Sequence, residues 1–176
     1  MTLQKSTKVG SAIKLLSKEE ELTNEQMSMD LNVSTSLMNQ MRNDRRNMQQ
    51  DIARDSVAMY DNPRYTMEIL HEFSDGFAVP MMDGKAVDWH RLSLLAMLKK
   101  QFEEALEALK EVDFTKPPQA MEKHERELMV KAFDEILDAR LSLENWLTQL
   151  QEDYNISIKK RMKAMTPRWK ARGWLQ

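Results

Sequence analysis

The sequence predicts an all-α protein, and three observations support that fold class. Apolar residues recur at three- and four-residue spacing through most of the 176-residue chain, with no alternating strand pattern of useful length. Hydrophobic residues make up 41% and charged residues 31% of the chain, which is typical of a globular protein. Only four glycines and five prolines are present, so few positions break the helical pattern.

A break in this pattern predicts a domain boundary. The stretch SDGFAVPMMDGKAVD contains two of the four glycines together with Pro80. Gly and Pro are the residues that most often separate regular elements, and the chain is long enough for two small cores. We therefore expect an N-terminal helical domain over residues 1–75, a linker over 76–86 and a C-terminal helical domain over 87–176.

The C-terminal part predicts two long helices that pack as an antiparallel hairpin. A seam with heptad spacing predicts a helix over residues 87–112. It consists of Leu95, Leu98, Phe102, Ala105, Leu109 and Val112. Pro117 and Pro118 then end the helix because they lack amide donors. A second seam with the same spacing consists of Met129, Phe133, Ile136, Arg140, Leu143, Leu147, Leu150 and Tyr154. Burying a leucine-sized side chain is worth about 1.5–3 kcal/mol, so the two seams are expected to pack together.

The apolar surface of this hairpin is wider than one partner helix covers. Beside the seams lie Leu92, Leu94, Ala132, Leu137, Leu141 and Trp146. We expect a second copy of the chain to cover the excess, so that the hairpin makes a homodimer. The predicted oligomerisation residues are Leu95, Leu98, Phe102, Leu109, Met129, Phe133, Ile136, Leu143, Leu147 and Leu150. The alternative is that the N-terminal domain or the tail covers this surface within one chain.

The N-terminal part predicts two short helices joined by a tight turn. Thr23 precedes Gln26 by three residues, which is the spacing of a capping box at a helix start. Asn32 follows this helix, and asparagine tolerates the left-handed backbone conformation that such a turn requires. Ser34 or Thr35 then caps the next helix. The side chains expected to face inward from both helices are Met27, Leu31, Met38 and Met41.

Residues 22–38 resemble the helix-turn-helix of the phage Cro and repressor family, also called Xre-like. The family places a small residue in its first motif helix, here Ser28, and a glycine in the turn, where this chain has Asn32. The apolar residues that fix the angle between the helices correspond to Met27, Leu31, Val33 and Met38. The resemblance implies a five-helix domain whose last two helices are residues 49–60 and 64–73. It covers roughly the first two-fifths of the chain.

The resemblance implies a sequence-specific, double-stranded DNA-binding transcriptional regulator of phage or mobile-element type that acts as a dimer. In this family the second motif helix enters the major groove, where base edges present distinct hydrogen-bonding patterns. The residues that would face the bases are Thr35, Ser36, Asn39, Gln40 and Asn43. Contacts with phosphates are implied for Arg42, Arg45 and Arg46, and a contact with the DNA backbone for Asn24.

Charge is distributed unevenly along the chain, although the net charge is only −2. Residues 99–153 contain eight basic and fourteen acidic residues, whereas residues 159–172 contain seven basic residues and no acidic one. This tail also carries Trp169 and Trp174. Three uses of the tail remain open: phosphate contacts, docking on the acidic region through charge and buried tryptophan, or binding to another protein.

Other functional classes receive little support from the sequence. The histidines His71, His90 and His124 lie far apart, and the glycines form no nucleotide-binding motif. We therefore expect no catalytic residue, no metal and no cofactor. The absence of cysteine, of a long apolar stretch and of an apolar leader predicts a cytoplasmic protein without membrane association.

Two alternatives to a regulator remain. One is a DNA-packaging adaptor resembling phage small terminase subunits, which also join a helix-turn-helix to a helical oligomerisation hairpin. The other is a helical protein–protein interaction module. A large ring would indicate the packaging adaptor, whereas a dimer would indicate the regulator.

Overall fold

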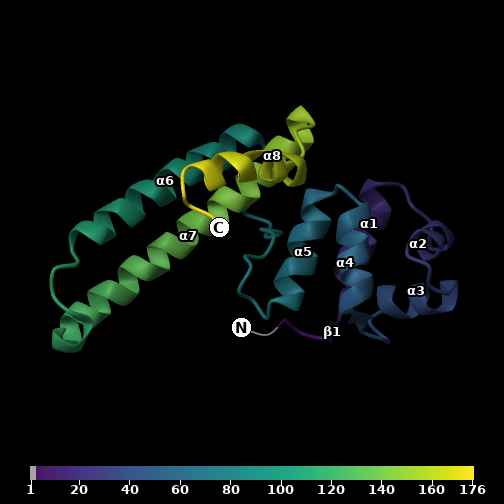
Figure 1. The fold of residues 1–176 in the computed structure, drawn as a ribbon, viewed down its shortest axis with the longest axis horizontal. Helices are drawn as coiled ribbons and strands as arrows, with labels where there is room; N and C mark the ends of the chain where they lie inside the picture. The colour runs from purple at the N-terminus through teal and green to yellow at the C-terminus, as the bar shows by residue number, and fades with distance from the viewer. Residues whose placement is uncertain (1–2) are drawn as a thin grey trace. The chain divides into compact units, whose positions relative to one another are not determined.

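The computed structural model describes residues 3–176 and confirms the all-α prediction (Figure 1). Eight α-helices and one short 3-10 helix lie within this described range. The helices of the N-terminal part are α1 (Gly10–Glu19), α2 (Asn24–Asp30), α3 (Thr35–Arg42), α4 (Gln50–Met59) and α5 (Pro63–Phe73). The C-terminal part contains α6 (Arg91–Lys110), η1 (Pro118–Ala120), α7 (Lys123–Tyr154) and α8 (Ile158–Ala171).

The chain divides into two compact units that differ from the predicted domains at the tail. The first unit consists of Met1–Met81 and Ile156–Gln176, and the second of Met82–Asn155. The tail was expected to belong with the hairpin, but it groups with the N-terminal unit. The physical reason is that the Lys159 ammonium donates hydrogen bonds to the carbonyl oxygens of Val57 and Ala58, at 3.0 and 3.1 Å.

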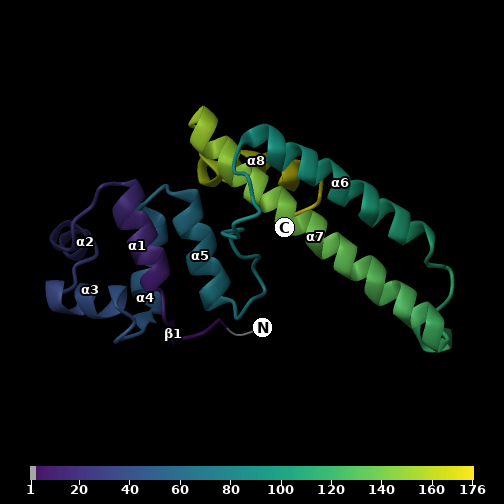
Figure 2. The ribbon, with the colours of Figure 1, turned by 180° about the vertical axis from the view of Figure 1, so that it is seen from behind.

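Helices α1, α4 and α5 lie side by side in the N-terminal unit, with α2 and α3 at one end (Figures 1 and 2). Helix α1 contacts both α3 and α5, and the core between these helices is almost fully closed to solvent. Its largest buried side chains are Ile13, Leu16, Met27, Met38, Met41, Met48 and Tyr65. Three methionines of the helix-turn-helix segment are therefore core residues, as their spacing predicts.

A small two-stranded sheet, which the sequence analysis did not anticipate, closes the base of this unit. Strand β1 (Ser6–Thr7) pairs antiparallel with β2 (Met48–Gln49), with Ser6 opposite Gln49 and Thr7 opposite Met48. Each strand has only two residues, which is too short for an alternating pattern to appear in the sequence. The pairing joins the segment before α1 to the segment before α4.

A buried hydrogen bond links α4 to α5. The Tyr65 hydroxyl donates to Ser56 Oγ at 2.7 Å, and the Ser56 hydroxyl in turn donates to the carbonyl oxygen of Ala53. Burial raises the pKa of Tyr65 to about 12, although the hydrogen bond to Ser56 opposes this shift. The phenol is therefore neutral at physiological pH, as a hydrogen-bond donor in an apolar core has to be.

The second unit is an antiparallel hairpin of α6 and α7, as the sequence predicts (Figure 1). The connection between them contains Lys116, whose ammonium lies 2.7 Å from the Glu125 carboxylate in the first turn of α7. This contact raises the pKa of Lys116 and lowers the pKa of Glu125. Glu122 and Glu125 form a capping box that begins α7, two residues after the 3-10 helix ends.

The predicted seams are only partly used between α6 and α7. The buried residues of the hairpin include Leu94, Leu98, Ala105 and Ala108 on α6, with Ala132 and Ala139 on α7. Several large seam residues instead remain exposed: Phe102, Phe133, Ile136 and Leu147. The contact runs through alanines because small side chains allow two helices to approach closely, and the large residues are displaced from it.

Candidate nucleic-acid interface

The local structure of residues 23–43 is a helix, a tight turn and a second helix. Thr23 and Gln26 form the predicted capping box at the start of α2, with both reciprocal hydrogen bonds present. Asn32 adopts the left-handed conformation, with φ of 50°, which confirms the conformation predicted for the turn. Ser34, one of the two candidate caps, accepts a hydrogen bond from the Leu37 amide and begins α3.

A small residue is required at position 28 because α2 and α3 meet there. Ser28 is buried, and its Oγ lies 3.2 Å from Thr35 Oγ1 while also donating to the carbonyl oxygen of Glu25. A larger side chain at this position would push the start of α3 away from α2. The Thr35 hydroxyl is therefore engaged within the motif, which leaves the other predicted base-facing residues more open than Thr35.

A polar chain of hydrogen bonds links the two motif helices at the surface. The Arg42 guanidinium donates to Asn24 Oδ1 at 2.8 Å, and Asn24 Nδ2 donates to Asn39 Oδ1. Asn24 begins α2, whereas Asn39 and Arg42 lie on α3. These bonds fix the direction of the Asn39 amide, because its oxygen accepts from Asn24 and its nitrogen remains directed elsewhere.

The predicted base-facing residues share one side of α3. They follow a spacing of one, three, one and three residues, which places them on a single helix face opposite the buried Met38 and Met41. Ser36, Asn39 and Asn43 are exposed, and Gln40 is half-buried. Gln40 Nε2 donates to Ser36 Oγ, and Asn43 Nδ2 donates to the carbonyl oxygen of Asn39. The face therefore presents amide and hydroxyl groups that are held by their neighbours.

The predicted phosphate-contacting arginines lie at and beyond the end of α3. Arg42 is half-buried and bonded to Asn24, whereas Arg45 and Arg46 are exposed in the following turn. Their amides donate to the carbonyl oxygen of Gln40, which folds this turn back against α3. Three positive charges thus border the amide-rich face.

A buttress that the sequence analysis did not identify supports the end of α3. The Gly10 amide at the start of α1 donates to Asp44 Oδ1 at 2.9 Å. A Cβ atom at position 10 would lie 2.6 Å from both the Arg42 carbonyl oxygen and Asp44 Oδ2. Asp44 itself has φ of 55°. Only glycine allows this close approach, so α1 positions the end of α3 through Gly10. No short-range pattern in the sequence indicates a contact between residues 34 positions apart.

The basic helix α8 is attached to the first unit at its start. The Ser157 hydroxyl donates to Asp61 Oδ1 at 3.0 Å, and the Lys159 ammonium meets the carbonyl oxygens at the end of α4. All residues of α8 are described, and none is buried. Trp174 is 65% exposed, with the Arg172 guanidinium 4.9 Å from its ring centre. Docking within one chain through a buried Trp174 is therefore not observed.

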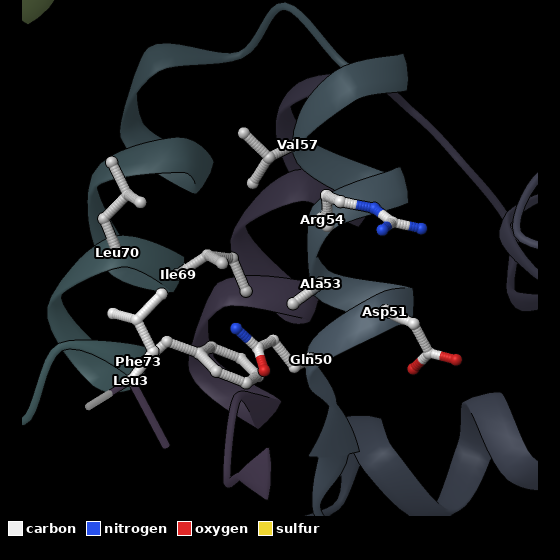
Figure 3. Close-up of a pocket in the computed structure, with 9 residues that line it drawn as sticks. All are labelled: Leu3, Gln50, Asp51, Ala53, Arg54, Val57, Ile69, Leu70 and Phe73. Atoms are coloured by element: carbon white, nitrogen blue, oxygen red, sulfur yellow. The ribbon is translucent and has the colours of Figure 1, made fainter. Parts of the chain in front are cut away.

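An apolar groove of about 580 Å³ lies between α4 and α5 of the same unit (Figure 3). Its lining residues are Leu3, Gln50, Asp51, Ala53, Arg54, Val57, Ile69, Leu70 and Phe73. Figure 3 shows that the charged ends of Asp51 and Arg54 point away from the apolar side chains. The groove therefore lacks converging charged groups and is separate from the amide-rich face of α3.

Further observations limit the kinds of site present. Among residues 3–176, no group of three or more histidine, aspartate or glutamate side chains has an arrangement suited to a metal ion. No helix in the described range is both long and apolar enough to cross a bilayer. Comparison with known proteins finds no matching family model, no similar curated protein and no similar solved structure.

Proposed function

We propose that the protein is a sequence-specific, double-stranded DNA-binding transcriptional regulator that acts in the cytoplasm. The observation that carries this proposal is the exposed polar face of α3, in which Asn39 is oriented by Asn24 and Asn24 is held by Arg42. Asparagine and glutamine amides match the donor and acceptor pair that adenine presents in the major groove. A polar face that was only solvated would not need a hydrogen-bonded brace from a neighbouring helix.

The charges around this face suit binding to a duplex. Arg42, Arg45 and Arg46 follow or end α3, where guanidinium groups reach phosphates on either side of a groove. The nearest acidic side chain in the turn, Asp44, accepts a hydrogen bond from the Gly10 amide. Its negative charge is thereby partly satisfied within the protein, which reduces repulsion toward DNA.

Selection of bound sequences from a random duplex pool tests this function. We expect enrichment of one short motif, and binding to that motif at least a hundredfold tighter than to shuffled duplex at the same salt concentration. The logarithm of the binding constant should fall linearly with the logarithm of salt concentration, because phosphate contacts release counterions. Tight binding without any enriched motif, or no binding to duplex at all, would contradict the proposal.

Helix α8 is expected to add phosphate contacts to this interface. Changing Arg161, Lys163, Arg168 and Lys170 to glutamine should weaken DNA binding and make it less sensitive to salt, by up to about one unit of slope per lost contact. The variant retains Ser157 and Lys159, which attach the helix to the first unit, and α8 buries no residue. Its urea midpoint should therefore equal that of the wild type.

A matched variant removes the same positive charge from the other unit. It changes Lys99, Lys100, Lys110 and Lys123 to glutamine, and it should retain the wild-type salt slope. A lower urea midpoint for the α8 variant, with unchanged DNA binding, would instead indicate that the tail docks on protein.

A further inference from the structure

Large apolar side chains of the hairpin are left without a partner by the way α6 and α7 pack. The contact between the two helices uses residues one position away from the heptad seam on α6, such as Leu94 and Ala108, and alanines on α7. Phe102 and Leu106 on α6 and Phe133 on α7 are between 43% and 60% exposed. Aromatic and leucine side chains in a heptad pattern are seldom left in water.

These side chains lie on one face of the hairpin. Successive residues of an α-helix are rotated by about 100°, so Phe102 and Leu106 lie clockwise of Leu98 when α6 is viewed from its N-terminus. Phe133 and Ile136 lie clockwise of Ala139 when α7 is viewed in the same way. Because the two helices run in opposite directions, equal rotations bring both sets to the same side of the hairpin. We call this side the open face.

The opposite side of the hairpin is polar. It carries Glu104 and Glu111 on α6 and Glu127, Asp134 and Asp138 on α7, all rotated anticlockwise from the contact between the helices. The apolar surface is therefore concentrated on one side and is not an even coating. A helical hairpin that is apolar on one side and acidic on the other is suited to burying only the first side.

The size of the open face matches what a stable dimer requires. Its exposed members are Leu92, Phe102, Leu106, Phe133, Ile136, Leu137 and Leu147, with exposed fractions between 38% and 60%. With about 150–250 Å² for a large apolar side chain, they leave on the order of 600 Å² accessible. Half-buried Leu95 and Met129 extend the same face. A standard stable interface takes about 800 Å² from each partner.

We propose that the open face pairs with the open face of a second copy of the chain, so that two hairpins form a four-helix bundle. The rim of the face supports self-pairing because it carries both signs of charge, including Lys99 and Glu103 on α6. Two identical faces can then meet without accumulating like charge. A consequence that rests on the proposed DNA-binding function is that one dimer carries two copies of α3, which suits a site with two half-sites.

Analytical ultracentrifugation of the full chain without DNA tests the pairing. Across micromolar concentrations the wild type should have a mass of twice the 20.7 kDa chain. Phe133→Glu, and independently Leu106→Glu on the other helix, should raise the dimer dissociation constant at least tenfold. Both side chains are about 60% exposed, so the helical circular dichroism of each variant should be unchanged.

Lys131→Glu provides the matched control. Lys131 lies two residues from Phe133 on the same helix, its side chain is 59% exposed, and it points toward the acidic side of the hairpin. It should leave the dimer intact. A monomeric wild type, an assembly larger than a dimer, or equal loss of dimer in Lys131→Glu would overturn the pairing. Failure of DNA binding would appear separately, because Phe133→Glu should still bind a single half-site.

Discussion

Replacement of both Asn39 and Gln40 by alanine is expected to abolish the preference of the protein for its selected DNA site over shuffled duplex. Each amide that pairs with a base edge in bidentate fashion contributes about 1–3 kcal/mol of discrimination, so loss of two such pairs removes a hundredfold preference or more. Methionines on the buried side of α3 are untouched, so the fold should persist. Mobility shifts with selected and shuffled duplex, at one salt concentration, measure the effect.

The remaining affinity distinguishes base reading from general attraction. Arg42, Arg45 and Arg46 are retained in this variant, so weak binding to both duplexes should continue with a similar salt dependence. A control that changes Asn47 and Gln119 to alanine removes the same amide types from exposed positions outside α3, and it should keep full discrimination. Unchanged discrimination in the Asn39 and Gln40 variant would remove the basis for α3 as the reading helix.

The second large effect is expected at Gly10, where alanine should destabilise the N-terminal unit by about 1–3 kcal/mol. The new Cβ would lie 2.6 Å from the Arg42 carbonyl oxygen and from Asp44 Oδ2, so α1 or the end of α3 has to move. Because the carbonyl belongs to the backbone, no side-chain rotation relieves the contact. For a unit of this size, each 1 kcal/mol lowers the melting temperature by about 4–8 °C.

Gly84→Ala is the natural control for this substitution. A Cβ atom at Gly84 would meet only Val87 Cγ2, at 4.0 Å, which is an ordinary van der Waals distance. Its melting temperature should match the wild type. Gly10→Ala should also weaken DNA binding, because a shift of the Arg42 backbone disturbs the hydrogen bond between Arg42 and Asn24. A stable Gly10→Ala protein with unchanged DNA affinity would show that α1 does not position α3.

Features governed by neighbouring residues were predictable from the sequence. The capping box of Thr23 and Gln26 and the left-handed Asn32 depend on side chains within a few positions, and both are present in the structure. Buried Met27 and Met38 follow from helical periodicity in the same way. The apolar seams correctly indicated two long antiparallel helices, because that pattern repeats over many turns.

Features that depend on tertiary contacts were not predictable in this way. Asn24 and Arg42 are 18 residues apart, and nothing local indicates that their side chains meet. The attachment of α8 joins Lys159 to carbonyl groups about 100 positions earlier, so the tail was assigned to the wrong side of the chain division. In the hairpin, the heptad pattern marks apolar faces, but it does not decide whether alanines or larger residues form the contact within one chain.

The attachment of Lys159 to the end of α4 also affects the connectivity of the molecule. The chain leaves the first unit after Met81 and re-enters it at Ile156, so the hairpin is inserted between two parts of one unit. It is joined by two covalent connections instead of one. A module tethered at both ends has fewer accessible orientations than one on a single linker, which lowers the entropy lost when both units are held by a common ligand.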